Sequence, residues 1–123
     1  MNYKKILLFQ VEKEKKKQIV ALCRSLDITP VIVPRGQFEE TLGALAGIDG
    51  FALSNKGYGG EALPTDMLVF SGISPDVLDI FLKEYKTAGI EPTCLKAVLT
   101  QHNVFWNARQ LYEELYKEHK ELK

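Results

Sequence analysis

The sequence has few of the residues that carry chemistry or crosslinks. Its 123 residues include only 2 cysteines and 2 histidines. Cys23 and Cys94 lie far apart and form no C-x-x-C pair, which is typical of reduced, buried thiols in a cytoplasmic protein. His102 and His119 have no neighbour at metal-ligand spacing, so we expect no metal site.

The sequence also has no excess of charge of either sign, because 16 basic residues balance 16 acidic ones. Binding to nucleic acid or to an acidic membrane depends on uncompensated positive charge, so we expect neither partner. Long apolar runs are missing as well. The run at residues 6–9 is too short for the core of a signal peptide and for a membrane span. We therefore expect a cytoplasmic protein without a membrane segment.

What is present is ordinary for a globular α/β protein. Apolar residues make up 46% of the chain and charged residues 26%, and the length predicts a single domain over residues 1–123. Short apolar runs predict buried strands, and stripes of apolar residues at helical spacing predict amphipathic helices. The strands are expected near residues 5–11, 31–33, 67–70 and 94–99, with helices over about 12–27, 38–46, 75–88 and 103–123.

This pattern of strand, helix, strand and helix occurs twice, over about 5–47 and 66–116. Both copies place an isoleucine and a proline in the same helix-to-strand turn, as Ile28, Pro30, Ile90 and Pro92. We interpret the chain as a duplicated β-α-β-α unit with right-handed crossovers. Such a unit predicts a small, mostly parallel four-stranded sheet packed with helices. The sequence does not fix the relative direction of the two halves.

Residues 48–65 connect the halves and differ from the rest of the chain. Glycine is dense there, and apolar residues follow no period, which predicts a surface connector with at most a short strand at 50–53. The glycines around Tyr58 do not follow a strand and open a helix, so we expect neither a phosphate-binding loop nor a nucleotide cofactor. Connectors of this length are uncommon in small domains and are sometimes functional.

A family resemblance covers nearly the whole chain, from Lys5 to Leu115. The first half carries LCRSLDITPVIVP and LGALAG, and the second half carries MLVFSGIS and LKAVLTQHNVFW. With these segments the chain resembles the bacterial family known as domain of unknown function 3783, in which K-A-V-L-T-x-x-N-x-x-W is a habitual motif. The resemblance implies no activity, ligand or catalytic residue. His102 stands where the family pattern has a small residue such as threonine, so the resemblance gives this histidine no role.

If all four strands are parallel, the loops that follow them meet at one edge of the sheet, where α/β proteins bind ligands. Polar and aromatic residues in or near these loops and in the connector are therefore candidate ligand or partner contacts. They are Arg35, Tyr58, Ser71, Thr100, His102, Asn103 and Trp106. Arg35 could clamp a carboxylate or phosphate. The alternatives are that Arg35 is a solvated turn residue and that Ser74 and Asn103, or Thr100, only cap helices.

Two further features allow two interpretations each. Trp106 and Phe105 could form an exposed binding anchor, or the tryptophan could pack on the connector. Tyr58 would then be its partner, or the tip of a mobile flap. The lysines between residues 13 and 17 could hold an anion at the start of a helix, or could form a solvated face.

No catalytic constellation emerges from the sequence. Cys23 lies on the buried face of a predicted helix and is a poor nucleophile there. Asp66, Asp76 and Asp79 surround the start of one helix, as partners of its dipole do. Our first hypothesis is a non-catalytic binding or regulatory module that acts through protein contacts, including self-association as a homodimer. The alternative is a small-molecule or anion sensor that uses Arg35 and the loop 100–103, and an enzyme is the third possibility.

Overall fold

The computed structural model of the chain describes residues 4–54, 57, 60, 62–92 and 95–121. Two residues discussed above, Tyr58 and Cys94, lie outside this part of the chain. The elements follow the order β1 (Lys5–Phe9), α1 (Lys13–Ser25), β2 (Thr29–Val33), η1 (Arg35–Gln37), α2 (Leu42–Ala46), β3 (Met67–Ser71), α3 (Pro75–Thr87), β4 (Leu95–Val98), η2 (Asn103–Phe105) and α4 (Ala108–Glu121). The α/β class and the four strands are confirmed.

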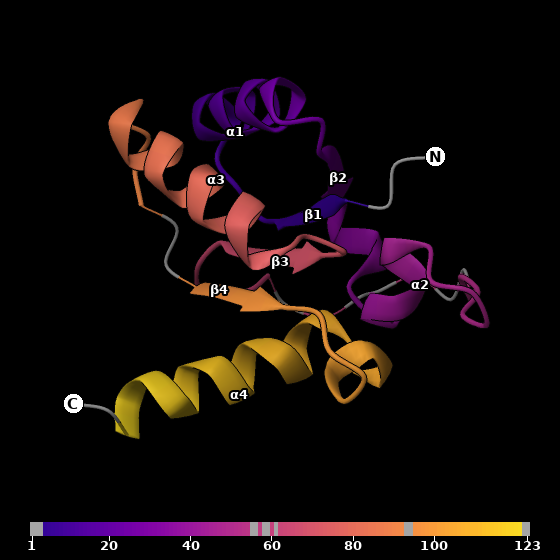
Figure 1. Cartoon of the computed structure of the whole chain (residues 1–123). Helices are drawn as coiled ribbons and strands as arrows, with labels where there is room; N and C mark the ends of the chain where they lie inside the picture. Colours follow the sequence, from indigo (N-terminus) through magenta and orange to yellow (C-terminus); the bar gives the residue numbers. More distant parts are fainter. Residues whose placement is uncertain (1–3, 55–56, 58–59, 61, 93–94, 122–123) are drawn as a thin grey trace.

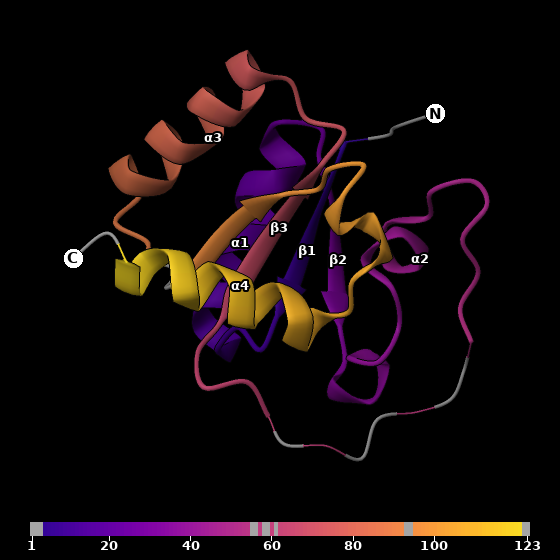
Figure 2. The ribbon, with the colours of Figure 1, turned by 90° about the horizontal axis from the view of Figure 1, so that it is seen from below.

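The strands form one sheet in the order β2-β1-β3-β4 (Figure 2). β1 pairs with β2, and β3 with β4, in parallel, but the central pair of β1 and β3 is antiparallel. The prediction of a mostly parallel sheet is therefore corrected to a mixed sheet whose halves run in opposite directions. The connector explains this reversal. The backbone N–H of Leu63 donates to the side chain of Gln10, so the connector arrives where β1 ends and β3 runs back along it.

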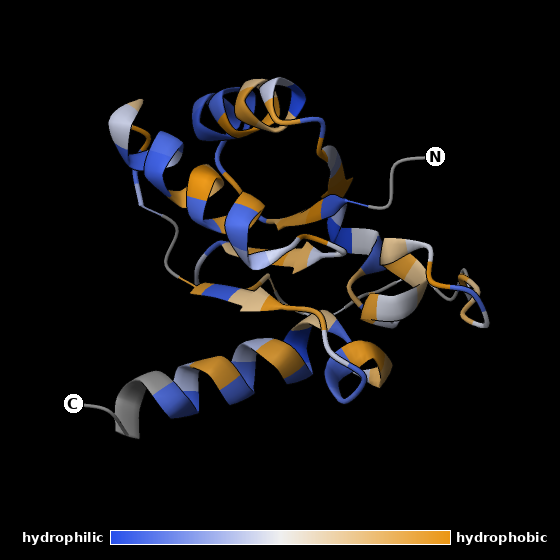
Figure 3. Cartoon of the chain, in the orientation of Figure 1, coloured by the Kyte–Doolittle hydropathy of each residue, from blue (hydrophilic) through white to orange (hydrophobic). Residues whose placement is uncertain are grey.

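Helices cover both faces of the sheet. α1 and α3 lie on one face, while α4 and α2 lie on the other (Figures 1 and 2). Because side chains alternate along a strand, each strand supplies both cores. In β1, Leu7 and Phe9 point toward α2 and α4, whereas Ile6 and Leu8 point toward α1 and α3. Figure 3 shows the resulting hydrophobic colour along the central strands.

The helix boundaries follow local capping. Ser74 caps α3 by accepting from the N–H of Val77, with proline in the first turn, as predicted. Gly47 ends α2 with φ of 74°, which also fits the prediction. The last helix begins later than the expected Asn103. Trp106 has an extended backbone, and Asn107 and Gln110 form a reciprocal cap with two N–H···O bonds of 2.9 Å.

The connector is fastened to the sheet by side chains, and the described residues 50–53 form no strand, contrary to the prediction. Gln10 forms a two-way amide contact with the backbone of Leu63. The buried carboxylate of Glu40 accepts from the N–H of Ser54 at 2.6 Å and from its hydroxyl at 3.1 Å. These bonds hold the connector against the body of the protein at Ser54 and at Leu63.

The lysines at the start of α1 do not all form a solvated face. The interpretation of a solvated face is wrong for Lys15. The Lys15 Nζ lies 2.5 Å from Asp66 Oδ2, at the entry to β3, and 2.7 Å from the carbonyl oxygen of Pro92. The two charged side chains are only 7% and 12% exposed. Lys15 therefore joins α1 to both strands of the second half. Lys17 remains exposed, in contact with Glu14 at 3.6 Å.

Candidate functional site

Because the central pair is antiparallel, the residues of the predicted site are divided between the two opposite edges of the sheet at which strands begin and end. β1 and β2 end at one edge, with Gln10 and Arg35 beyond them. β3 and β4 end at the other edge, where Ser71 and Thr100 lie. The four loops therefore do not converge, and the expectation that Arg35 and the loop 100–103 act together is wrong.

At the first edge, the side chain of Arg35 binds the connector. Its Nη2 donates to the carbonyl oxygen of Gly60 at 2.5 Å. A separate cleft at this edge, of about 450 Å³, is lined by Gln10, Lys15 and Asp66 among others, so its lining includes the buried ion pair described above. These side chains bond to one another or to the backbone. These contacts show that the side chains stabilise the fold.

At the second edge, the loop after β4 is closed by its own hydrogen bonds. The Thr100 hydroxyl accepts from the N–H groups of His102 and Asn103 at 3.2 and 3.0 Å. The Asn103 side chain accepts from the N–H of Thr100 at 2.8 Å and donates to the carbonyl of Val98 at 3.1 Å. In a parallel pair of this register, that carbonyl points away from β3, toward the open side of the sheet. Asn103 thus fixes the loop and covers the end of the edge strand.

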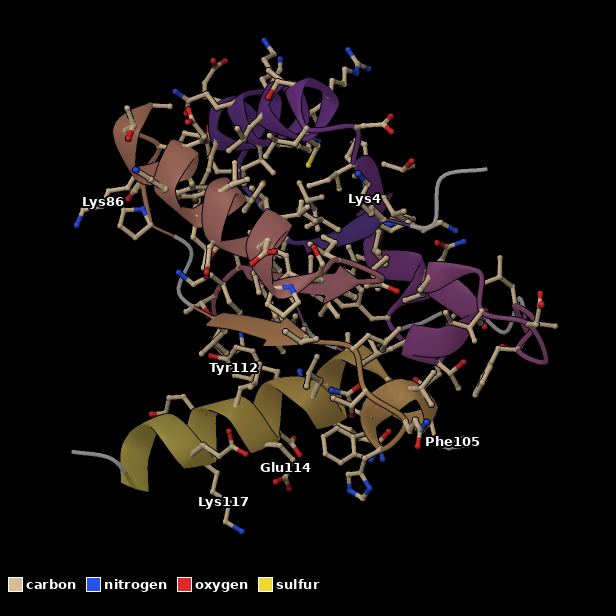
Figure 4. All side chains as sticks on the ribbon, viewed as in Figure 1. Lys4, Lys86, Phe105, Tyr112, Glu114 and Lys117 are labelled. Atoms are coloured by element: carbon tan, nitrogen blue, oxygen red, sulfur yellow. The ribbon has the colours of Figure 1, made fainter. Side chains whose placement is uncertain are left out.

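The aromatic pair that follows this loop is split by the extended backbone of Trp106. Trp106 is half-buried, packs against the core between the sheet and α4, and meets His102 edge-on with ring centroids 5.3 Å apart. Phe105 is 67% exposed (Figure 4), and its ring lies 5.3 Å from that of Phe51 in the connector. Phe105, and not Trp106, is therefore the exposed aromatic of this edge.

Beside Phe105 the surface is hollowed. This apolar hollow has a volume of about 420 Å³. Its walls come from the connector, the ends of β3 and β4, and η2. The lining residues are Ile48, Phe51, Ser71, Gly72, Leu99, Thr100, Gln101, Val104 and Phe105. Two of the predicted contacts, Ser71 and Thr100, belong to the lining. His102 and Asn103 bond to Thr100 through their backbone N–H groups, and Trp106 packs against the core.

The connector residues of the hollow were not predicted as contacts, because Ile48 and Phe51 belong to no periodic pattern. One signal in the sequence could have revealed them. Gly43 lies in α2, and a β-carbon there would come within 2.6 Å of Val104 and 2.8 Å of Phe51. A glycine inside an apolar helical stripe often marks such a close approach.

The described residues around the apolar hollow supply polar groups but no charged side chain. None of the described lining residues of the apolar hollow is ionisable. Burial raises the pKa of the Cys23 thiol to about 12, and this residue of α1 packs against the sheet and α3, on the other face. Within the described part of the chain, no three histidine, cysteine or acidic side chains gather as a metal site would require. The walls can therefore exclude water, and the polar groups can orient a bound molecule.

The comparisons with known proteins agree with part of the sequence interpretation. Over the residues described, none of the helices is long and apolar enough to cross a membrane. No curated protein and no solved structure matches the chain. A family model described as "Domain of unknown function (DUF3783)" matches residues 66–122. The match spans β3, α3, β4, η2 and α4, so it covers a shorter range than the predicted Lys5 to Leu115. Through the segment 66–122, the chain belongs to the DUF3783 family.

Proposed function

We propose that the protein is a non-catalytic binding module whose apolar hollow takes up a small, largely apolar molecule. The observation that carries this proposal is the hollow itself, with a volume of about 420 Å³, five apolar side chains and three polar residues in its lining. Ligand sites typically measure roughly 300–1,000 Å³ and combine apolar walls with a few polar groups. The position agrees with this function, because loops after parallel strands form binding sites in α/β proteins.

The lining itself argues for binding without turnover. Its hydroxyl groups belong to Ser71 and Thr100, and no histidine or carboxylate among the described lining residues could act as their base. A hydroxyl needs such a base to become a nucleophile. The anion-sensor form of the hypothesis receives less support, since the guanidinium of Arg35 lies at the opposite edge and bonds to the connector.

A test is to titrate the protein with toluene, a small apolar probe, by calorimetry or ligand-observed NMR. We expect a Kd of about 1 mM, given the affinity per atom that small ligands reach. Ile48→Trp should weaken binding at least about tenfold, because the larger side chain fills the hollow from its rim. Leu53→Trp is the matched control, since Leu53 is also exposed on the connector but does not line the hollow. Toluene binding that survives Ile48→Trp unchanged would contradict the proposal.

A second candidate function, docking of a protein partner or of a second copy, is favoured by Phe105. A phenylalanine exposed at 67% beside an apolar depression is the kind of residue that anchors interfaces. If copies associate here, native mass spectrometry should show a dimer that Phe105→Ser abolishes. Val98→Ser is the control, because Val98 is 49% exposed on another part of the surface. A dimer that persists with serine at 105 would exclude this face as the contact.

We also propose that the two halves are an internal repeat, as their sequences suggest. From β1 through α1, and from β3 through α3, equivalent residues are 62 positions apart. Positive φ angles recur at equivalent turns, with 57° at Asp27 and 71° at Gly89. In each copy the next isoleucine donates its N–H to the carbonyl five residues earlier, from Ile28 to Cys23 and from Ile90 to Tyr85. The proposal includes a single domain built from two such units. It also includes a cytoplasmic location, where the buried free thiol of Cys23 would stay reduced.

A further inference from the structure

We infer that the molecule bound in the apolar hollow is uncharged and carries a hydroxyl or carbonyl group that hydrogen-bonds to Ser71 and Thr100. This inference rests on the proposed function and specifies the ligand class. Its basis is the hydrogen-bonding state of two side chains at the ends of β3 and β4. These strands are neighbours, since the N–H of Leu99 donates to the carbonyl of Phe70 at 2.8 Å. The register that pairs Phe70 with Val98 continues to this bond, and both Ser71 and Thr100 belong to the lining of the hollow.

Ser71 carries a buried hydroxyl with an unused hydrogen-bonding capacity. The residue is only 4% exposed, and its side chain makes no hydrogen bond within the described part of the chain. It alternates with Met67 and Val69, so it points to the same face of the sheet as Leu99 of the hollow. No fully enclosed side-chain oxygen or nitrogen among the described residues lacks a partner. The Ser71 oxygen must therefore be open to the hollow.

Thr100 complements Ser71 because its oxygen already accepts two hydrogen bonds, from the N–H groups of His102 and Asn103. A hydroxyl has two acceptor lone pairs and one donor hydrogen. What Thr100 can still offer to a ligand is its hydrogen, and that hydrogen needs an oxygen or nitrogen acceptor. Ser71 can donate or accept. A ligand hydroxyl or carbonyl satisfies both residues, whereas a hydrocarbon satisfies neither.

Charge on the ligand is disfavoured by the same lining. An ion transferred from water into an apolar site loses hydration that only an opposite charge or several donors can replace. One cation that lies close to Ser71 along the chain pairing is Lys5, which is opposite Ser71 in the pairing of β1 with β3. Its ammonium donates to the carbonyl oxygen of Ala46 at 2.7 Å, at the end of α2. The ammonium of Lys5 thus binds the negative end of a helix and is not directed at an anion in the hollow.

The experiment compares three probes of similar shape, toluene, p-cresol and benzoate, on the wild type and on Ser71→Ala. On the wild type we expect p-cresol to bind about tenfold more tightly than toluene, because one hydrogen bond to an otherwise unpaired group has that effect. Hydrophobicity alone favours toluene, so this order reports the hydrogen bond. Benzoate should bind more weakly than both. Ser71→Ala should remove most of the p-cresol advantage and bring the p-cresol to toluene ratio close to 1.

The outcomes separate this inference from the proposed function. If toluene and p-cresol bind wild type equally well, the head-group inference is overturned while the hollow remains a binding site. If benzoate binds most tightly, the uncharged class is wrong, and Lys5 turns toward the ligand. If p-cresol keeps its advantage in Ser71→Ala, the serine is not its partner. If neither neutral probe binds, the proposed function fails together with the inference.

Discussion

Replacing Asp66 by alanine should lower the free energy of unfolding by about 3 kcal/mol. This is the largest loss that we expect from replacing a single charged residue. The variant leaves the ammonium of Lys15 buried without its carboxylate, which lies 2.5 Å away in the wild type. An uncompensated buried charge is costly because the interior cannot replace the hydration lost on folding. The carbonyl of Pro92 still accepts from Lys15 at 2.7 Å, which keeps the loss at the lower end of the range for broken buried pairs.

Urea unfolding, followed by far-ultraviolet circular dichroism, measures this loss. Glu14→Ala is the matched control. The pair of Glu14 with Lys17 spans 3.6 Å between side chains that are 74% and 63% exposed, so breaking it should change stability by less than about 0.5 kcal/mol. Joint replacement of Lys15 and Asp66 by methionine and leucine should recover most of the stability, because neither charge remains buried. Equal effects of Asp66→Ala and Glu14→Ala would contradict the role assigned to the buried pair.

Lys15 also shows what the sequence could and could not predict. It stands one turn before Ile19 and two turns before Cys23, both of which are buried, so it continues the buried stripe of α1. The spacing therefore contained the signal, but the surrounding lysines favoured a solvated face. Its partners, Asp66 and Pro92, come from the second half of the chain and no local pattern links them to α1. Long-range pairing of this kind depends on the tertiary arrangement.

The same distinction explains the fold as a whole. Strands and helices were predicted because their periodicity and caps are local, as Ser74 and Gly47 illustrate. The antiparallel pairing of the halves was not predicted, because it depends on where the connector attaches, and Gln10 and Leu63 make that attachment through side-chain and backbone groups 53 residues apart. This one feature separated Arg35 from Ser71. The sequence therefore named two residues that line the apolar hollow, Ser71 and Thr100, but did not indicate its connector walls.

Gly43→Ala should destabilise the protein by about 1–3 kcal/mol and weaken toluene binding, although alanine is the better helix former. The added β-carbon would lie 2.6 Å from a methyl carbon of Val104 and 2.8 Å from the ring of Phe51. Both residues line the apolar hollow, and a branched valine has little rotamer freedom with which to move away. The strain must displace a wall of the hollow. Helix propensity alone would instead raise stability by about 1 kcal/mol, so the two effects predict opposite signs.

Gly36→Ala is the control, because a β-carbon at Gly36 meets no atom within 4 Å. It should leave toluene binding unchanged and shift the unfolding free energy by less than about 1 kcal/mol. Urea unfolding and toluene calorimetry on both variants separate a local effect on the hollow from a general response to alanine. A Gly43→Ala protein that is more stable than wild type and binds toluene equally well would show that α2, Phe51 and Val104 are not closely packed. A side chain at position 43 must push Phe51 of the connector and Val104 of η2 apart if they pack as described. Unchanged binding would therefore mean that the shape of the hollow does not depend on this contact.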